Sequence, residues 1–167
     1  SLAMRARAPV FLRVNRALGS RAAVQAELAA EGIATEPHPL AETALVVTEG
    51  ARRIAQSAAY AQGLVELQDA ASQAVLQLLP PQGLGRVLDY CAGGGGKALA
   101  LAAAEPKAKI TAHDIDAGRM RDIPARAKRA GARIALAQPG AVQGRFDLVM
   151  VDAPCSGSGT WRRTPAA

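Results

Sequence analysis

The chain has 167 residues, 50% of them hydrophobic, so it is long enough to bury the core of one medium domain or of two small ones. It has no run of about 18 apolar residues, so the sequence predicts no membrane-spanning helix. Its first residues lack the apolar core of a signal peptide. The formal net charge of +6 favours a polyanionic partner such as nucleic acid, although an Arg- and Ala-rich composition produces such a charge without selection for binding.

The chain has two cysteines, Cys91 and Cys155, and two histidines, His38 and His113. Their spacing is not typical of a metal site. We therefore expect no bound metal, reduced thiols and a cytoplasmic location. Aromatic residues make up only 3% of the chain and are scattered. Any contact with RNA is therefore expected to be mainly to phosphate groups rather than to stacked bases.

The first sixty residues are expected to form a small α+β unit. An extended segment over 11–14 precedes a helix over 21–31, which Ser20 can cap and Gly32 can end, and a strand follows near 44–48. The character of the chain changes around residues 60–63.

A second unit is expected to follow. A short extended segment over 64–68 leads to Asp69, which can cap a helix that runs through residue 79. After Pro80 and Pro81, strands and helices alternate at short spacing, which predicts a parallel sheet with covering helices. The predicted strands are 86–90, 109–114, 133–137 and 146–151, and the predicted helices are 97–104 and 117–130.

Pro124 and the last strand of this second unit carry two further expectations. Pro124 falls inside the last predicted helix and should kink that helix or mark its true start. The apolar run 148–151 in the last strand is typical of a strand that is buried on both faces.

A glycine-rich loop follows the first of these strands, at the edge where open α/β sheets bind ligands. Four consecutive glycines, 93–96, separate the strand from a helix that begins at Lys97. Glycines let a ligand approach the backbone, and the first N–H groups of a helix are unpaired. Because a tight turn needs only one or two glycines, we predict a cofactor loop.

The identity of the cofactor stays open at this point. A phosphate-binding P-loop is disfavoured, because Ala98 stands where the hydroxyl residue for magnesium is required. Asp114 ends the second predicted strand, a position where an acid binds a ribose diol. Together with Gly93, Gly95 and Ala98 it satisfies the dinucleotide fingerprint, yet S-adenosylmethionine offers the same diol.

A second loop begins at Asp152, directly after the last predicted strand, and reads Asp-Ala-Pro-Cys-Ser-Gly. Pro154 fixes φ and Gly157 frees the backbone, so Asp152 and Cys155 are expected on a tight, shaped loop. A thiol in this position suggests nucleophilic chemistry. The alternative is an ordinary polar turn with a half-buried cysteine.

The two loops together resemble those of the RsmB/Nop2/Sun family of S-adenosylmethionine-dependent RNA cytosine-5 methyltransferases. The family's first motif, D-x-C-A-x-P-G-G-K, is matched by Asp89, Cys91, Ala92, Gly95, Gly96 and Lys97. Its fourth motif, D-A-P-C-S-G followed by R-R-x-P, is matched by 152–157 with Arg162, Arg163 and Pro165. Residues 67–73 are similar to the segment before the catalytic domain, and residues 11–15 to the start of the RNA-binding module.

The resemblance implies an α/β fold. An incomplete Rossmann-like methyltransferase sheet, its first four parallel strands with covering helices, is expected to follow a small α+β N-terminal module. Residues 1–60 are then a partial RNA-binding-like module, and residues 61–167 are the N-terminal part of the methyltransferase domain. The chain stops before the family's later Thr-Cys motif, so we expect a fragment of a longer protein that is inactive alone, with its last strand at a sheet edge.

The resemblance also implies roles for single residues. S-adenosylmethionine is expected to contact the first loop and an acid after the second strand: Cys91, Ala92, Gly93, Gly94, Gly95, Gly96, Lys97 and Asp114, with Asp116 as the alternative acid. The expected catalytic residues are Asp152, which contacts the target cytosine, and Cys155. Arg162 and Arg163 are expected to bind RNA, with ribosomal RNA favoured over transfer RNA and with no membrane or metal partner.

In this chemistry a thiolate adds to C6 of cytosine and activates C5 for methylation, after which loss of the C5 proton and of the thiol restores the ring. The residues of this chain alone indicate Cys155 as the nucleophile. The resemblance implies instead that the later Thr-Cys cysteine attacks and that Cys155 assists product release.

Four departures from the family pattern keep alternatives open. Gly93-Gly94 replaces Ala-Pro, Ala98 replaces Thr or Ser, residues 138–140 replace the acid near the adenine, and the chain stops before the later cysteine motif. One alternative is a noncatalytic RNA-binding or assembly protein with a degenerate cofactor pocket. A nicotinamide-dependent oxidoreductase is less favoured, because it leaves residues 152–157 unexplained.

Overall fold

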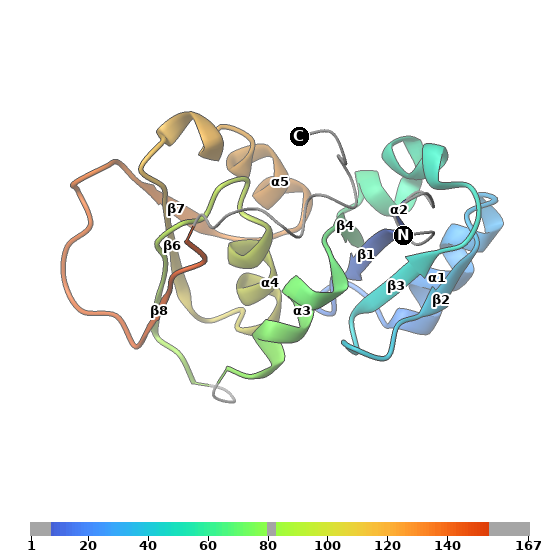
Figure 1. The fold of residues 1–167 in the computed structure, drawn as a ribbon, viewed down its shortest axis with the longest axis horizontal. Helices are drawn as coiled ribbons and strands as arrows, with labels where there is room; N and C mark the ends of the chain where they lie inside the picture. The colour runs from blue at the N-terminus through green and yellow to red at the C-terminus, as the bar shows by residue number, and fades with distance from the viewer. Residues whose placement is uncertain (1–7, 80–82, 154–167) are drawn as a thin grey trace, which may run out of the picture.

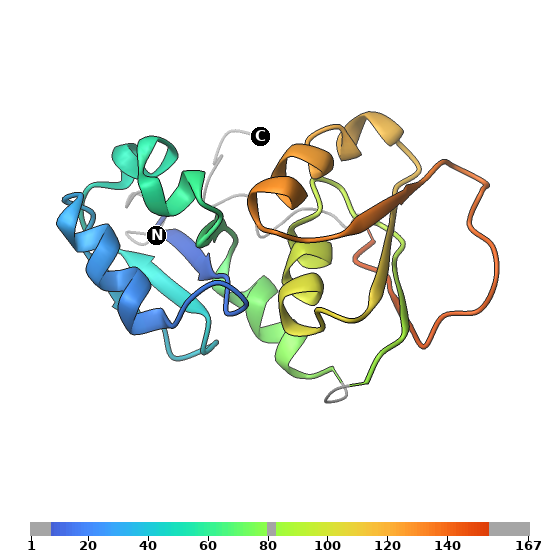
Figure 2. The ribbon, with the colours of Figure 1, turned by 180° about the vertical axis from the view of Figure 1, so that it is seen from behind.

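The structure, a computed structural model, describes residues 8–79 and 83–153. An antiparallel and a parallel sheet form two units that lie side by side, with helix α3 (Ala70–Gln77) between them (Figure 1). The view from behind shows helix α5 (Ile123–Arg129) facing the N-terminal unit (Figure 2). The contact between the two units therefore runs along α3 and α5.

The antiparallel sheet has the strand order β2-β3-β1-β4. Leu12 of its central strand and Leu28 of its long helix are fully buried in one core, because a strand alternates its faces and an amphipathic helix buries one stripe. The elements of this unit are β1 (Val10–Val14), α1 (Arg21–Ala30), β2 (Thr35–Pro37), β3 (Ala44–Val47), the 3-10 helix η2 (Ala51–Gln56), α2 (Ala58–Ala61) and β4 (Val65–Leu67).

The predicted elements of this unit are present, with their caps. The Ser20 side chain accepts a hydrogen bond from the N–H of Ala23 at the start of α1, and Gly32 follows the helix with a φ of +73°. Sequence patterning does not predict β2, η2 or α2. β2 contains Pro37, which cannot donate to a sheet ladder, and the strand accordingly lies at a sheet edge.

Strand β4 pairs antiparallel with β1, and this register places Glu66 opposite Arg13. β4 therefore belongs to the N-terminal sheet by its hydrogen bonding, although it lies beyond residue 60. The division into residues 1–60 and 61–167 stays a prediction.

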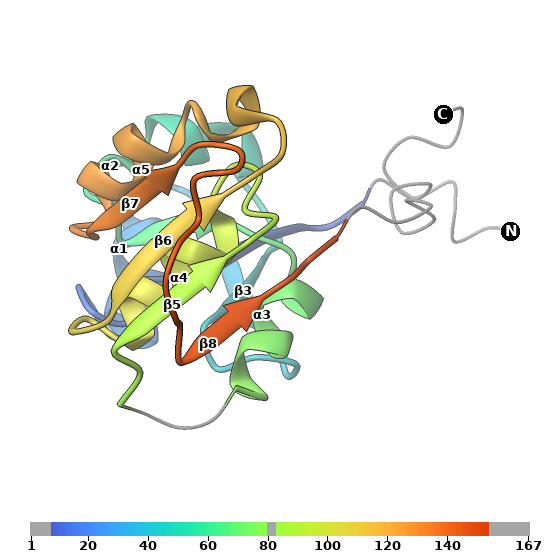
Figure 3. The ribbon, with the colours of Figure 1, turned by 90° about the vertical axis from the view of Figure 1, so that its left-hand side faces the viewer.

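The second unit contains the predicted parallel sheet, in the order β7-β6-β5-β8, with helices on one side of it (Figure 3). Val87, Ile110 and Leu101 pack between sheet and helices. This architecture confirms the predicted fold class. None of the described helices is long and apolar enough to cross a bilayer. The elements that follow α3 are β5 (Arg86–Asp89), α4 (Gly96–Ala104), β6 (Lys109–His113), the 3-10 helix η3 (Ala117–Met120), α5, β7 (Ile134–Ala137) and β8 (Leu148–Met150).

Pro124 divides the helix that was expected over 117–130. Residues 117–120 form η3, and α5 begins at Ile123, so that Pro124 lies in its first turn. Proline is tolerated there because the first N–H groups of a helix have no partner within the helix. The expectation that Pro124 marks the true start of the helix is confirmed.

One expectation about strand β8, its burial on both faces, is wrong. The run 148–151 was expected to be buried on both faces, but Val149 is 51% exposed and Val151 is 58% exposed. Met150 is buried against the core, because the described helices cover one face of the sheet and strand residues alternate between faces. β8 ends the strand order, as expected for an edge strand, and is only 3 residues long.

The close approach of the two units predicts a large effect of Gly63→Ala on stability. Gly63 has a φ of +74°, and an added Cβ would meet the carbonyl of Arg129 and lie 2.8 Å from Cα of Ala130. Gly83 has a φ of +90° with open space around its Cβ position, so Gly83→Ala should cost only the left-handed strain of ~1–2 kcal/mol.

We expect Gly63→Ala to lower the midpoint of thermal unfolding clearly more than Gly83→Ala does. Equal losses for the two variants would show that the units do not pack as described.

Candidate active site

The backbone of the glycine loop adopts conformations that favour glycine. Gly93 has a φ of +50° and Gly95 a φ of +80°. A Cβ on Gly95 would lie 2.7 Å from Cγ1 of Ile123, so the loop packs directly on α5. Gly95 precedes α4, and no side chain among the described residues caps this helix. The first two N–H groups of the helix, those of Gly96 and Lys97, are therefore available to a ligand.

The loop is tied to the buried carboxylate of Asp114, which is 1% exposed at the end of β6. Its Oδ2 accepts a hydrogen bond of 2.9 Å from the N–H of Gly93 and lies 3.2 Å from Nη1 of Arg119. Its Oδ1 accepts a hydrogen bond of 3.1 Å from the N–H of Asp116. Burial raises the pKa of Asp114, but these N–H groups and the nearby positive charges outweigh it and hold the pKa below its usual value.

Asp116, the alternative acid, has a different role in the structure. Its carboxylate accepts a hydrogen bond of 2.9 Å from the N–H of Gly118 and caps η3. Only Asp114 of the two acids contacts the glycine loop.

A cavity of about 330 Å³ lies on the Asp114 side of the loop. One wall is formed by Tyr90, whose ring stacks on His113 at a centroid distance of 4.3 Å. Residues 139 and 140, from the segment where the family's acid is absent, form part of another wall. The lining residues are Tyr90, Cys91, His113, Asp114, Ile115, Arg119, Pro139 and Gly140.

A smaller cavity of about 140 Å³ lies on the other side of the loop and shares Cys91 with the first. β5 and β8 are neighbours in the sheet, so the segments that follow them meet here. Nζ of Lys97 lies 2.5 Å from Oδ2 of Asp152, which joins the two predicted loops. The lining residues are Gln68, Ser72, Asp89, Cys91, Ala92, Gly96, Lys97 and Asp152.

Asp89 is a site residue that the sequence motif contains but to which no role was predicted. It is 1% exposed at the end of β5 and lines the smaller cavity. Neither carboxylate oxygen has a hydrogen-bond partner of ordinary geometry among the described residues, although the N–H of Ala98 is near enough to lower the pKa. Burial raises the pKa of Asp89 to about 6, because its effect is larger than the lowering by this N–H and by the charge of Lys97. An acid as the last residue of a strand, before a glycine loop, was the available signal.

The structure brings most of the predicted site residues together. Those that line one or both cavities are Cys91, Ala92, Gly96, Lys97, Asp114 and Asp152. Residues 93–95 shape the loop without lining either cavity, and Asp116 lines neither. The predicted residues Cys155, Arg162 and Arg163 lie outside the described residues.

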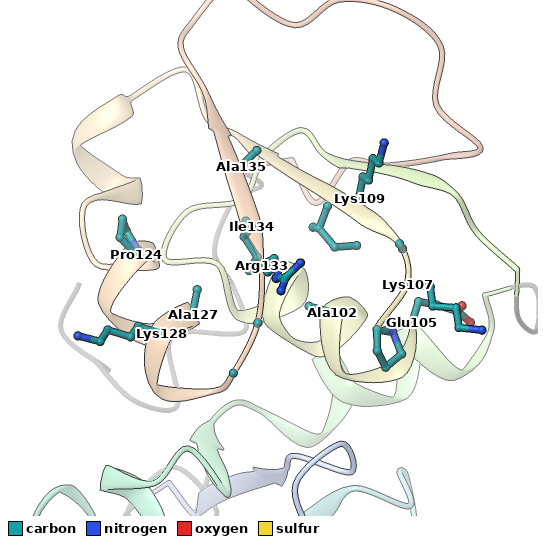
Figure 4. Close-up of a pocket in the computed structure, with 15 residues that line it drawn as sticks. Ala102, Glu105, Lys107, Lys109, Pro124, Ala127, Lys128, Arg133, Ile134 and Ala135 are labelled. Atoms are coloured by element: carbon teal, nitrogen blue, oxygen red, sulfur yellow. The ribbon is translucent and has the colours of Figure 1, made fainter.

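A groove of about 1090 Å³ lies at the opposite end of the sheet, between α4, α5 and the starts of β6 and β7 (Figure 4). Lys107, Lys109, Lys128 and Arg133 are among its lining residues, and none of the predicted site residues is. Within residues 8–79 and 83–153, no three His, Cys, Asp or Glu side chains are grouped so that they could hold a metal ion.

Comparison with known families decides the assignment. Residues 76–167 match the family model "16S rRNA methyltransferase RsmB/F", and residues 2–53 match the ferredoxin-like domain of RsmF/B-like methyltransferases. The chain belongs to the RsmB/F methyltransferase family. This confirms the resemblance that the two loop motifs indicate.

Relatives of this RsmB/F chain are named ribosomal RNA small subunit methyltransferase B. The protein from Vibrio cholerae is 37% identical over 166 residues, and that from Xanthomonas campestris is 38% identical over 167 residues. Each match covers 95% of this chain but only 38% of the relative. The chain therefore spans well under half the length of these relatives.

Solved structures share the fold. PH0851 matches with a TM-score of 0.86 and 27% identity, over 98% of this chain and 39% of that protein. A methyltransferase homolog protein from Pyrococcus horikoshii matches with a TM-score of 0.77 and 27% identity, over 95% of this chain and 54% of the other. NSun6 from Pyrococcus horikoshii matches with a TM-score of 0.77 and 17% identity, over 92% of this chain and 65% of NSun6. At this identity the match shows the fold alone.

Asp89 predicts a pH-dependent stability of the cofactor-free protein. Its pKa of about 6 in the folded chain lies above the value of 3.8 for an unperturbed aspartate, so the folded state binds the proton more tightly than the unfolded state. The contribution of Asp89 to stability is therefore fully present below pH 4 and is lost as the pH rises through about 6, by ~3 kcal/mol at most.

Asp89→Asn should remove this loss of stability between pH 4 and pH 7.5, as measured by thermal unfolding. Glu49→Gln, at an exposed carboxylate, is the matched control and should keep the wild-type slope. The same slope in wild type and in Asp89→Asn would contradict the raised pKa.

Proposed function

We propose that the full-length protein is an S-adenosylmethionine-dependent methyltransferase that methylates C5 of a cytosine in 16S rRNA. The observation that carries the proposal is the pair of cavities that flank one glycine loop, where the segments after β5, β6 and β8 meet. The names of the relatives support a ribosomal RNA substrate. The choice of C5 rests on the loop motifs.

The larger cavity fits the nucleoside part of S-adenosylmethionine. Each oxygen of a carboxylate has two lone pairs, so Asp114 can accept from ribose hydroxyls while it still accepts from the loop. Ile115 and Pro139 offer apolar surface for an adenine ring. The loop motif from Asp89 to Lys97, which resembles that of S-adenosylmethionine-dependent methyltransferases, supports the choice of cofactor.

The smaller cavity fits the methionine end. Asp89 has buried carboxylate oxygens without a hydrogen-bond partner, and an ammonium group would supply both the charge and the donors that they lack. The N–H groups of Gly96 and Lys97 at the start of α4 suit a carboxylate. When bound, the cofactor supplies the methyl group, and the residues of this chain orient it.

The target base is proposed to bind beyond Asp152. The ion pair with Lys97 fixes the Asp152 carboxylate beside the glycine loop, where it can accept a hydrogen bond from the edge of a cytosine. Cys155 follows three residues later and is proposed to serve product release, with the attacking thiolate supplied by the later Thr-Cys motif. Arg162 and Arg163 are proposed to contact RNA phosphates.

The domain division and the location belong to the same proposal. Residues 1–60 are proposed as part of an RNA-binding module and residues 61–167 as the start of the catalytic domain. The matched ferredoxin-like domain over residues 2–53 supports a separate N-terminal unit. A ribosomal substrate is consistent with the proposed cytoplasmic location.

The two acids near the ribose site give a matched pair of variants. Asp114→Asn should weaken binding of S-adenosylmethionine to the full-length protein by about 10- to 100-fold, because a charged acceptor is lost. Asp116→Asn should change the affinity little, because Asp116 caps η3 instead. Isothermal titration calorimetry measures both.

No detectable binding by the wild-type protein would contradict the proposal and favour the noncatalytic RNA-binding alternative. A larger loss with Asp116→Asn than with Asp114→Asn would exchange the roles of the two acids.

The proposed release role of Cys155 predicts a trapped intermediate. In the full-length protein, Cys155→Ala should still allow the later cysteine to add to cytosine, but the covalent RNA adduct should accumulate. Denaturing gel electrophoresis with labelled RNA detects the adduct. A complete absence of adduct in this variant would return the role of nucleophile to Cys155.

A further inference from the structure

Four charged side chains meet where the N-terminal sheet contacts α5. Glu66 of β4, only 2% exposed, lies opposite Arg13 of β1 in the sheet register. Its Oε2 accepts hydrogen bonds from Nη2 of Arg126 at 2.9 Å and from Nε at 3.3 Å. Its Oε1 accepts from Nη2 of Arg129. A single carboxylate therefore pairs with two arginines of the other unit.

Arg126, which pairs with this carboxylate, also contacts the glycine loop. Its Nη1 donates a hydrogen bond to the backbone carbonyl of Gly94. A Cβ on Gly94 would lie only 3.1 Å from the same nitrogen, so the approach is close. One guanidinium therefore connects Glu66, in the N-terminal sheet, with the loop between β5 and α4.

Two further contacts between the N-terminal unit and α5 reach a different part of this helix. Nδ2 of Asn15 donates to the carbonyl of Ala130 at 3.0 Å, and the guanidinium of Arg129 lies 4.1 Å from the ring centroid of Tyr60. These contacts hold the C-terminal end of α5 and do not include the glycine loop. Of the two arginines that pair with Glu66, Arg126 bonds to the loop, and Arg129 has no bond to it among the described residues.

The charges in this cluster are unequal, because three guanidinium groups surround one carboxylate. Arg13 is 4% exposed, and its Nε and Nη1 have no partner among the described residues. Burial lowers the pKa of Arg13 to about 10, so it stays charged at neutral pH. Without Glu66, Arg126 would face two like charges in a poorly hydrated site. The carboxylate is therefore what holds Arg126 beside them, directed at the loop.

We propose that Arg126 is a positioning residue for the cofactor loop and that Glu66 holds it in place, so that the N-terminal sheet sets the conformation of the loop. The consequence for cofactor affinity rests on the proposed function. A cofactor that requires the loop in this conformation should bind more weakly when the link is broken.

The test compares two arginines that share one carboxylate. Arg126→Gln removes the link to the loop, whereas Arg129→Gln removes an ion pair with the same Glu66 and leaves the link. Both variants keep the carboxylate paired with a remaining arginine. Each variant also loses one further contact, that of Arg126 with Gly94 or that of Arg129 with the Tyr60 ring. They should therefore lose similar amounts of thermal stability, which separates positioning from general stabilisation.

The deciding measurement is hydrogen–deuterium exchange in the cofactor-free, full-length protein, followed in peptides that cover residues 91–96. The N–H of Gly93 donates to Oδ2 of Asp114 and the N–H of Gly95 donates to the carbonyl of Ala92, so the exchange of both amides reports the order of the loop. Arg126→Gln should speed their exchange about tenfold, which corresponds to ~1.4 kcal/mol of lost loop stability, and Arg129→Gln should leave it within about twofold of wild type. Equal exchange in the two variants, faster or unchanged, would overturn the proposal.

Cofactor titration supplies a second readout. Arg126→Gln should weaken binding of S-adenosylmethionine about tenfold, and Arg129→Gln should not. A wild-type protein that binds no cofactor would contradict the proposed function, while the exchange comparison would still decide the role of Arg126.

Glu66→Gln tests the other half of the link. It should speed loop exchange as Arg126→Gln does, and wild-type exchange in a folded Glu66→Gln protein would refute the role of Glu66. This substitution leaves three guanidinium groups without a counter-charge and is expected to be the least stable of the variants. The comparison of Arg126 with Arg129 keeps the proposal testable if Glu66→Gln does not fold.

Discussion

The buried carboxylate of Asp114 fixes the geometry of the whole candidate site. It directly follows β6 and accepts the N–H of Gly93, so the loop that follows β5 is held from the end of the neighbouring strand. A carboxylate that accepts several N–H groups stays ionised even when it is buried, and in this form both oxygens can accept from further donors. The position of the loop then follows from the sheet register, because parallel strands bring their carboxyl ends to one edge.

Asp114 and Asp89 lie at the ends of adjacent strands and have opposite electrostatic environments. Asp114 is satisfied by its own fold, whereas Asp89 lacks partners and has a raised pKa. This contrast is typical of a site that is partly preorganised and partly completed by its ligand. On the far side of the loop, Arg126 connects the site to the N-terminal sheet, so the loop is supported from two units of the protein.

Local patterns in the sequence predict much of this fold and the identity of the two loops. The Ser20 and Asp69 caps depend on neighbours within three residues and could be recognised directly. The pairing of Glu66 with Arg126 joins residues 60 positions apart and could not be recognised, because no local pattern specifies which charged groups meet. The exposure of Val149 was missed for a related reason: an apolar strand sequence does not say how many of its faces are covered.

The central claim is that the glycine loop presents S-adenosylmethionine to a cytosine of 16S rRNA. The most direct measurement incubates the full-length protein with unmethylated 16S rRNA and S-adenosylmethionine that carries an isotopic label in its methyl group, then identifies the labelled nucleoside after digestion. The account predicts label in 5-methylcytidine. Label in a different nucleoside, or no transfer to the RNA at all, would contradict it.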